Sequence, residues 1–330
     1  MTEQVTIGCG ARLHLGFLDL NGGLGRRFGS LGLALTAPQT RLVLRRAARP
    51  EVAGPEAARA AHALRVMQDA LGITAAHALL IETAMPAHAG LGSGTQLALA
   101  VAAALRHLHG LPADLAADAA RLGRGARSGI GIALFAAGGL VLDGGRPGPV
   151  DAGAAAGKTG PVRSGVPPLL ARLPVPEDWR VLLLLDPQRA GLAGAAEHGA
   201  FATLPKMPAT TAAALCRLAL MGVLPALAEG DLAAFGAALT ELQRAVGDHF
   251  APVQGGRFAS ARVAAALDRL AALGATGLGQ SSWGPSGFAF APDPDAAAWL
   301  HARLAADPAM PQTRVCRPRN HGAGLTAEGE

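Results

Sequence analysis

Cysteine and aromatic residues are scarce in this chain of 330 residues. The three cysteines, Cys9, Cys216 and Cys316, lie far apart and form no CxxC pair, so their spacing indicates neither a disulfide framework nor a zinc site. This usage favours a reducing, cytoplasmic location. Aromatic residues make up 4% of the chain, too few for the basic, aromatic-interleaved surface that is typical of a nucleic-acid-binding protein.

Long apolar runs and clustered lysines are lacking as well. The longest aliphatic run, residues 181–185, is far too short to cross a membrane, and the first residues lack the cationic and apolar segments of a signal peptide. The formal charge is +5, but lysine occurs only at Lys158 and Lys206 and the arginines are scattered. We therefore expect a soluble protein with no membrane or nucleic-acid partner, whose basic residues bind anionic small molecules.

A glycine-rich stretch at residues 86–96 carries the clearest chemical signal. Its glycines alternate with Ser93 and Thr95, a short buried strand is predicted before it, and an unbroken helix after it. Glycine lets backbone N–H groups approach a ligand closely, and a helix N-terminus favours negative charge, so the stretch predicts a phosphate-binding loop. The alternative is a tight turn of small residues that packs the helix against a sheet.

Two common phosphate loops do not fit this stretch. The dinucleotide fingerprint requires glycine where Thr95 stands, and the Walker loop requires Gly-Lys, whereas no lysine precedes Lys158. The loop therefore belongs to another class of phosphate site.

The amino-terminal region holds a second group of polar residues. Residues 5–18 alternate as a strand pair or one bent strand, with Arg12 and His14 on one face and Asp19 at its end. A glycine-rich loop follows and carries Arg26 and Arg27, which could bind a phosphate or carboxylate. An exposed strand face and a solvent loop are the alternative interpretations.

Two further glycine-rich stretches lie at residues 122–133 and 277–290. In the first, Arg124 and Arg127 are three residues apart, so on a helical turn they would be neighbours facing one anion. In the second, polar side chains precede Trp283, whose flat ring could hold a cyclic substrate. The alternatives are surface arginines in the first stretch and a hairpin with a core tryptophan in the second.

The remaining pattern predicts a β-rich start followed by mixed helices and strands, without internal repeats. Residues 147–176 are rich in glycine, proline and alanine and form a predicted linker, with the domain boundary between Asp143 and Trp179. Residues 247–256 are predicted to connect two helices, and the chain after about residue 316 to be a frayed tail. The other predicted elements are strands at 31–35, 40–44, 179–185 and 313–316, and helices at 56–71, 210–227, 231–246, 260–273 and 295–305.

Together these stretches resemble the superfamily of galactokinase, homoserine kinase, mevalonate kinase and phosphomevalonate kinase, the GHMP kinases. Their motif Pro-x-x-x-Gly-Leu-Gly-Ser-Ser-Ala is similar to residues 86–95 here. Residues 12–19, 92–96, 123–131 and 279–285 more specifically resemble the β-ribofuranosylaminobenzene 5′-phosphate synthase family. The resemblance covers residues 5–290. It implies an α+β, two-domain fold: a ribosomal-S5-like mixed β/α domain at 1–160, a ferredoxin-like α/β sandwich at 161–330, ligand in the cleft between them, and a homodimer.

The resemblance also implies a reaction. That family joins phosphoribosyl pyrophosphate to 4-aminobenzoate or 4-hydroxybenzoate with magnesium, releasing carbon dioxide and diphosphate, as a step toward tetrahydromethanopterin. The related kinases commonly carry an acidic residue shortly after a Ser-Gly pair, where it deprotonates the acceptor hydroxyl. Here no carboxylate follows Ser128 until Asp143, which argues against a kinase.

The resemblance leads to specific site assignments. The diphosphate is expected on Gly90, Leu91, Gly92, Ser93, Gly94, Thr95 and Gln96, and magnesium on Ser93, Thr95 and Asp19. Catalytic roles are expected for Asp19, His14 and Arg12, and other substrate contacts for Arg26, Arg27, Arg124, Arg127, Ser128, Gln280, Ser281, Ser282 and Trp283. The alternatives are an ATP-dependent small-molecule kinase on the same fold and a non-catalytic protein that binds a phosphorylated metabolite.

Overall fold

The structure is a computed structural model that describes residues 2–148, 165–189, 191 and 194–329, with the backbone alone for residues 194–198. The boundary predicted at residues 160 and 161, and the middle of the predicted linker with Lys158 and Arg163, lie outside the described residues.

Two long antiparallel strands form the centre of the first sheet. β1 (Thr2–Asp19) and β2 (Arg26–Arg46) pair along most of their length, so the strands predicted at 31–35 and 40–44 are parts of one strand. The sheet order is β12-β1-β2-β4-β3, and β2 also pairs β5 and β6, with β7 beside β5. The other strands are β3 (Glu51–Ala53), β4 (His77–Thr83), β5 (Leu140–Asp143), β6 (Arg146–Pro147), β7 (Leu169–Leu173) and β12 (Gly324–Gly329).

Helices cover one face of this sheet. The most buried of them is α2 (Ser93–Leu108), because apolar residues such as Leu99 and Val101 lie on nearly all of its sides. Their side chains share a core with Ile7 and Leu42 of the sheet. The other helices on this side are α1 (Ala57–Leu71), α3 (Leu115–Arg121) and α4 (Ile130–Ala137).

The second sheet is antiparallel and has the order β11-β8-β10-β9. Numbered along the chain this is a 4-1-3-2 order, the arrangement of a ferredoxin-like β-α-β-β-α-β unit, and it confirms the predicted sandwich. Leu182, Leu267 and Leu300 form the core between this sheet and its outer helices. The elements are β8 (Arg180–Leu185), β9 (Thr276–Gln280), β10 (Gly287–Ala291), β11 (Gln312–Cys316), α9 (Ala261–Ala272) and α10 (Pro294–Ala305).

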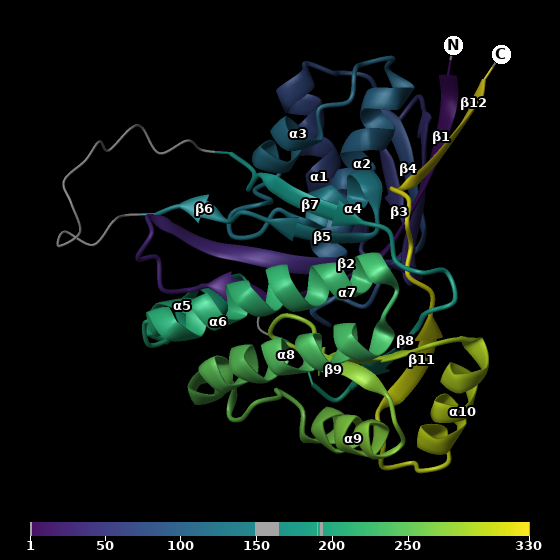
Figure 1. The fold of residues 1–330 in the computed structure, drawn as a ribbon. Helices are drawn as coiled ribbons and strands as arrows, with labels where there is room; N and C mark the ends of the chain where they lie inside the picture. The colour runs from purple at the N-terminus through teal and green to yellow at the C-terminus, as the bar shows by residue number, and fades with distance from the viewer. Residues whose placement is uncertain (1, 149–164, 190, 192–193, 330) are drawn as a thin grey trace.

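A layer of helices lies between the two sheets (Figure 1). It contains α5 (Gly194–Thr203), α6 (Ala209–Leu218), a π-helical turn (Ala219–Val223), α7 (Leu224–Glu229) and α8 (Leu232–Gln254). Leu215 and Leu239 from these helices join Leu13 and Phe290 from the two sheets in the largest core cluster. Within the described part of the chain, Ala209–Glu229 alone is long and apolar enough to cross a membrane, by length and composition.

Two predictions about connections were wrong. Residues 247–254 are the last turns of α8 and not a connector, because Val246 and Phe250 pack in the core at helical spacing despite Gly247 and Pro252. The tail predicted to fray forms β12, which pairs antiparallel with β1. Its residues are all exposed, so backbone pairing rather than a buried face holds the strand in place.

Candidate active site

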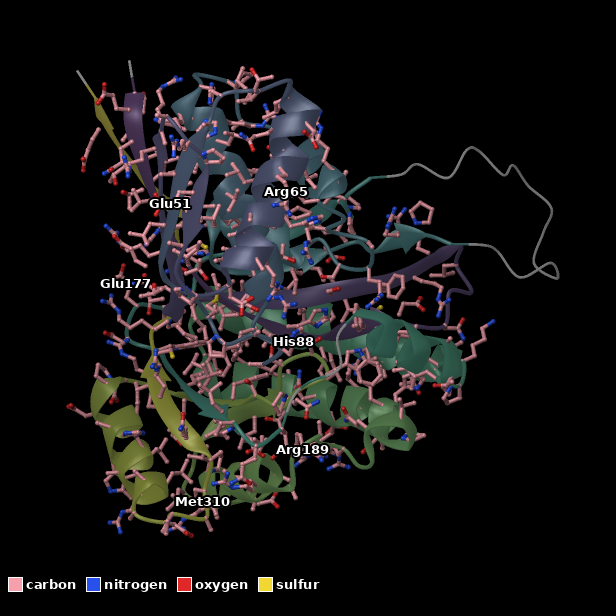
Figure 2. All side chains as sticks on the ribbon, turned by 180° about the vertical axis from the view of Figure 1, so that it is seen from behind. Glu51, Arg65, His88, Glu177, Arg189 and Met310 are labelled. Carbon is pink, nitrogen blue, oxygen red and sulfur yellow. The ribbon has the colours of Figure 1, made fainter. Side chains whose placement is uncertain are left out.

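The glycine-rich loop joins β4 to α2, as predicted. Gly90 and Gly92 have φ of 75° and 74°, a conformation that favours glycine, and Gly92 ends the loop as the N-cap of α2. No side chain caps the helix and its first turn has no acidic residue, so no side-chain cap and no carboxylate of its first turn competes with an anion at this helix N-terminus. His88 of this loop lies where the two halves of the molecule meet (Figure 2), and its carbonyl accepts from Gly191 N at 2.8 Å.

Two arginines converge on the first turn of α2. A Cβ atom on Gly94 would collide with the guanidinium of Arg59 and would lie 3.5 Å from Arg124 Nη1. Arg59 pairs with Glu56 at 2.8 Å, whereas Arg124 Nε is buried without a partner among the described residues. Burial and the nearby Arg59 both lower the pKa of Arg124. An anion between the two guanidinium groups would offset their repulsion.

A cavity of about 270 Å³ lies beside this arginine pair, and Arg59, His62, Gly94 and Arg124 are among the residues that line it. Arg59 was missed by the sequence analysis. It lies on α1, and nothing in its local sequence indicates that it contacts the start of α2, 34 residues further along the chain.

Two segments that are distant in sequence hold the loop through hydrogen bonds to the carbonyl of Gly90. Arg12 Nη1 and Ser281 Oγ both donate to the carbonyl of Gly90, at 2.9 and 2.7 Å. Ser281 Oγ in turn accepts from His14 N at 2.9 Å, and Ser282 N donates to the carbonyl of His14 at 3.2 Å. Three of the predicted segments therefore meet, and in these contacts Arg12 and Ser281 position the loop.

His14 is neutral in this setting. Burial, with a smaller effect of nearby Arg12, lowers its pKa well below the usual range. Its Nδ1 accepts from Gly16 N at 3.3 Å, which assigns the hydrogen to Nε2, and Nε2 has no partner within the described residues. The ring packs 4.4 Å from that of Phe17.

Asp19 does not lie beside the predicted magnesium ligands Ser93 and Thr95. Arg12 contacts the loop at Gly92, and seven residues of extended strand, about 20 Å, separate Arg12 from Asp19. Asp19 Oδ1 instead accepts from Asn21 N at 2.7 Å and shapes the turn after β1. The described residues contain no group of three His, Cys, Asp or Glu side chains that could hold a metal ion. Ser93 and Thr95 could therefore ligate magnesium only through their hydroxyls, with the oxygens of a diphosphate as its other ligands.

The two arginines of each predicted pair, Arg26 with Arg27 and Arg124 with Arg127, have different contacts in the structure. Arg26 donates to the carbonyls of Gly144 and Gly145, both at 3.0 Å, whereas Arg27 lies over Phe28 at 5.6 Å. Arg127 lies over Phe201, 4.7 Å from the ring, and Arg124 faces α2.

Arg124 and Arg127 are therefore not neighbours on a helical turn, the condition under which they were expected to face one anion. The positive φ values of Gly123 and Gly125, 67° and 83°, are incompatible with a helical turn there.

Asp143 is the carboxylate that could have served as a kinase base, and it is already occupied. It is buried, and its Oδ2 accepts from Ser128 Oγ at 3.1 Å and from Gly129 N at 2.8 Å, while Oδ1 accepts from Gly145 N at 2.9 Å. Burial raises its pKa, and these hydrogen bonds oppose the rise. Asp143 thus holds the turn before α4. The first turn of α4 is joined to the first turn of α2 by Gln96 Nε2, which donates to the carbonyl of Gly131 at 2.8 Å.

Gln280 and Trp283 point into the protein. Gln280 Oε1 accepts from Ala259 N at 2.7 Å, and its Nε2 donates to Gln254 Oε1 at 3.2 Å. Trp283 is 2% exposed and stacks on Phe250 with ring centroids 4.3 Å apart. The core interpretation of this tryptophan fits the structure better than an open platform, and the ring of Phe201 lies 5.2 Å from it.

Known proteins resemble this chain in sequence and fold. Residues 58–139 match the family described as GHMP kinases N terminal domain, and residues 223–307 match GHMP kinases C terminal. The phosphomevalonate kinase structure from Streptococcus pneumoniae superposes with a TM-score of 0.70 at 13% identity, covering 96% of this chain and all of that one. At this identity the likeness shows the fold alone.

Closer relatives come from archaea. The β-ribofuranosylphenol 5′-phosphate synthase of Methanothermobacter thermautotrophicus is 31% identical over 301 residues, 87% of this chain and 88% of the relative. The synthase of the same name from Archaeoglobus fulgidus is 34% identical over 242 residues, 71% of this chain and 73% of the relative. The chain therefore belongs to the GHMP kinase superfamily and, within it, to the β-ribofuranosylphenol 5′-phosphate synthase family.

Proposed function

We propose that this protein is a decarboxylating pentosyltransferase that joins phosphoribosyl pyrophosphate to 4-hydroxybenzoate or 4-aminobenzoate, in tetrahydromethanopterin biosynthesis. The product is a C-riboside 5′-phosphate, and carbon dioxide and diphosphate are released. The names of the relatives specify a phenol product, which favours 4-hydroxybenzoate. One observation carries the proposal: no side chain caps the start of α2, where Arg59 and Arg124 converge, while the carboxylate of Asp143 accepts three hydrogen bonds that hold a turn.

The donor diphosphate is proposed to bind at the start of α2. The N–H groups of the glycine-rich loop and the guanidinium groups of Arg59 and Arg124 lie on this side of the helix. Magnesium carried by the diphosphate would be held by the hydroxyls of Ser93 and Thr95, where it would neutralise phosphate charge.

This arrangement suits departure of a diphosphate better than activation of an alcohol. As the bond between ribose C1 and the diphosphate oxygen breaks, negative charge grows on the leaving group, and fixed N–H donors and guanidinium groups stabilise it. The ring carbon that bears the carboxylate then forms a bond to C1, and the bond to the carboxylate breaks to give carbon dioxide. The attacking carbon carries no proton, so no general base is needed at this carbon.

Carbon dioxide release tests the proposal. The purified protein is incubated with carboxyl-labelled 4-hydroxybenzoate or 4-aminobenzoate, phosphoribosyl pyrophosphate and magnesium, without ATP. We expect labelled carbon dioxide and diphosphate in equal amounts, and none when phosphoribosyl pyrophosphate is omitted. ADP formation from ATP and a small alcohol would identify a kinase instead, and binding of phosphoribosyl pyrophosphate without turnover would identify a binding protein.

The proposal includes a cytoplasmic homodimer, as the resemblance to the synthase family implies. Sedimentation equilibrium of the purified protein should give twice the mass of one chain, 33.1 kDa, and a single-chain mass would contradict the dimer.

A further inference from the structure

One long helix of the middle layer is only partly covered by the rest of the protein. α6, the π-helical turn and α7 form a single helix from Ala209 to Glu229, because the residues at both junctions keep helical backbone angles (Figure 1). The helix has two charged residues, Arg217 and Glu229, and only 33% of its most apolar 18-residue stretch is buried. A helix that is apolar on nearly all sides is normally enclosed, as α2 is, so this one lacks part of its cover.

The inner side of this helix is fixed in the protein core. Leu215, Ala219, Val223 and Leu227 are at most 2% exposed and belong to the largest core cluster. The helix cannot span a membrane without opening this core. Only its outer side is available to a partner.

The outer side presents two large apolar side chains at the π-helical turn. Leu220 is 53% exposed and Met221 is 74% exposed. A π-helical turn holds one residue more than an α-helical turn, so two consecutive apolar residues face outward here while Ala219 and Val223 stay in the core. Large apolar residues that are exposed side by side indicate a surface that contacts another molecule.

One charge lies on each side of these apolar residues. Arg217 is one turn before Leu220, and Glu229 is the last residue of α7, about 18 Å further along the helix than Arg217. Without the extra residue of the π-helical turn, the two charges are eleven residues or three turns apart, so they share one side of the helix. Both side chains are exposed, and neither has an ion-pair or hydrogen-bond partner within the described residues.

Two copies of this helix complement each other. When they pack antiparallel about a two-fold axis halfway between the charges, Arg217 of each copy lies beside Glu229 of the partner subunit, and the apolar residues lie between the two ion pairs. A membrane surface, in contrast, suits a helix whose polar face is rich in lysine and arginine, whereas this outer side has one arginine and one glutamate.

We propose that the outer side of the helix at Ala209–Glu229 is the interface between two copies of this chain. Leu220 and Met221 of both copies form its apolar centre, and two pairs of Arg217 with Glu229 lie at its ends. The inference rests on the homodimer included in the proposed function and assigns the surface that forms it.

Analytical ultracentrifugation of the full chain tests this interface. The unmodified protein should sediment as a dimer of the 33.1 kDa chain, and Met221→Glu as a monomer, because the interface would bury two unpaired carboxylates. The circular-dichroism spectrum of Met221→Glu should be unchanged, since this side chain is exposed in the single chain. Leu80→Glu, a change of a 47% exposed leucine on β4, is the matched control and should stay dimeric.

A charge exchange tests the antiparallel arrangement. Arg217→Glu should raise the dissociation constant of the dimer at least about tenfold, because each ion pair becomes a pair of like charges. The double variant Arg217→Glu with Glu229→Arg should restore the original constant, since both pairs form again with exchanged signs. Failure of the double variant to restore it would refute this arrangement.

The other outcomes separate the interface from the proposed function. A dimer that persists in Met221→Glu overturns the interface and leaves the homodimer standing. A monomeric unmodified protein overturns both, whereas the reaction is decided independently by carbon dioxide release. Binding of a monomer to vesicles of phosphatidylcholine and phosphatidylglycerol, lost in Met221→Glu, would identify a membrane-binding surface and overturn the proposal.

Discussion

Ser281 Oγ and the carbonyl oxygen of Gly90 are 2.7 Å apart, although 191 positions separate the two residues in the chain. Ser281 follows β9 of the second sheet, and Gly90 lies in the loop before α2. A ligand that binds the loop is therefore linked, through this hydrogen bond, to the turn after β9. The same carbonyl accepts from Arg12, so the loop is fixed from both sides.

Replacing this hydroxyl should weaken donor binding. In Ser281→Ala the Gly90 carbonyl accepts a hydrogen bond from Arg12 only, and His14 N loses its acceptor. The loss should lower the free energy of unfolding by about 1–3 kcal/mol. We expect a higher KM for phosphoribosyl pyrophosphate and a lower Tm by calorimetry. Thr313→Ala, which removes a weaker 3.3 Å bond on β11, is the control. Equal donor KM values in both variants would contradict a role for this contact.

The residue at position 94 should control the arginine pair. Gly94→Ser introduces the residue of the related kinases, and its Cβ collides with the Arg59 guanidinium, whose flexible end must move away. Loss of one charge-assisted contact should raise the donor KM about tenfold while stability holds. Gly8→Ser on β1, where a side chain meets nothing within 4 Å, should leave the donor KM unchanged.

Arg59 and Arg124 should act on the donor, and Arg127 should not. Each of Arg59→Met and Arg124→Met should raise the KM for phosphoribosyl pyrophosphate. Arg124→Met should not lower Tm, because it removes a half-buried charge close to Arg59. Arg127→Met should leave the donor KM unchanged, because its guanidinium lies over Phe201 and not beside Gly94. Steady-state kinetics with each substrate varied in turn would show these effects, and similar effects of all three changes on one substrate would refute the division.

A buried ion pair joins the last turn of α2 to α3. The Asp118 carboxylate accepts hydrogen bonds from Arg106 Nε at 2.5 Å and from Arg106 Nη2 at 2.8 Å, and both side chains are at least nine-tenths buried. Asp118→Ala leaves Arg106 buried and unpaired, which should cost about 3–5 kcal/mol in denaturant unfolding. Glu82→Ala removes the exposed pair with Arg41 and should cost at most about 1 kcal/mol. Equal losses in the two variants would show that burial of the first pair is unimportant.

Acid should weaken the fold through a histidine pair. His77 Nε2 and His109 Nε2 are 2.8 Å apart, and burial lowers the pKa of His77 to about 4 and also lowers that of His109. The unfolded imidazoles, with pKa near 6.5, bind protons first as pH falls, so stability should be lost between about pH 6.5 and pH 4.

His77→Gln should flatten this part of the profile of Tm against pH, because the variant has one titrating group fewer. His107→Gln, a change of an exposed histidine on α2, should keep the full slope. A slope that persists unchanged in His77→Gln would contradict the assignment.

Local chemistry made much of the fold predictable. Asp231 and Ser260 act as N-caps for α8 and α9, and the glycine-rich loop joins a strand to a helix, because these features depend on neighbouring residues. The meeting of the segments around Gly90 was predictable only through the family resemblance, since the residues involved are far apart in the chain.

The rest of the site depends on tertiary packing. Arg59 contributes because α1 and α2 meet there, and no local pattern marks it. His249 lies on the part of α8 where glycine and proline suggest a connector, but core packing of Phe250 keeps the helix going. The separation of Arg124 from Arg127 depends on two glycine φ angles that spacing does not reveal.

The pairing of β12 with β1 has a consequence for solubility. Residues 324–329 hydrogen-bond to the outer side of β1 from Thr2 to Gly8 and bury almost nothing themselves. A chain cut before residue 324 would keep its core but present a row of unpaired N–H and C=O groups, which other chains could join by adding strands. The last strand therefore covers this row and leaves its own short outer edge, six residues long, as the edge of the sheet.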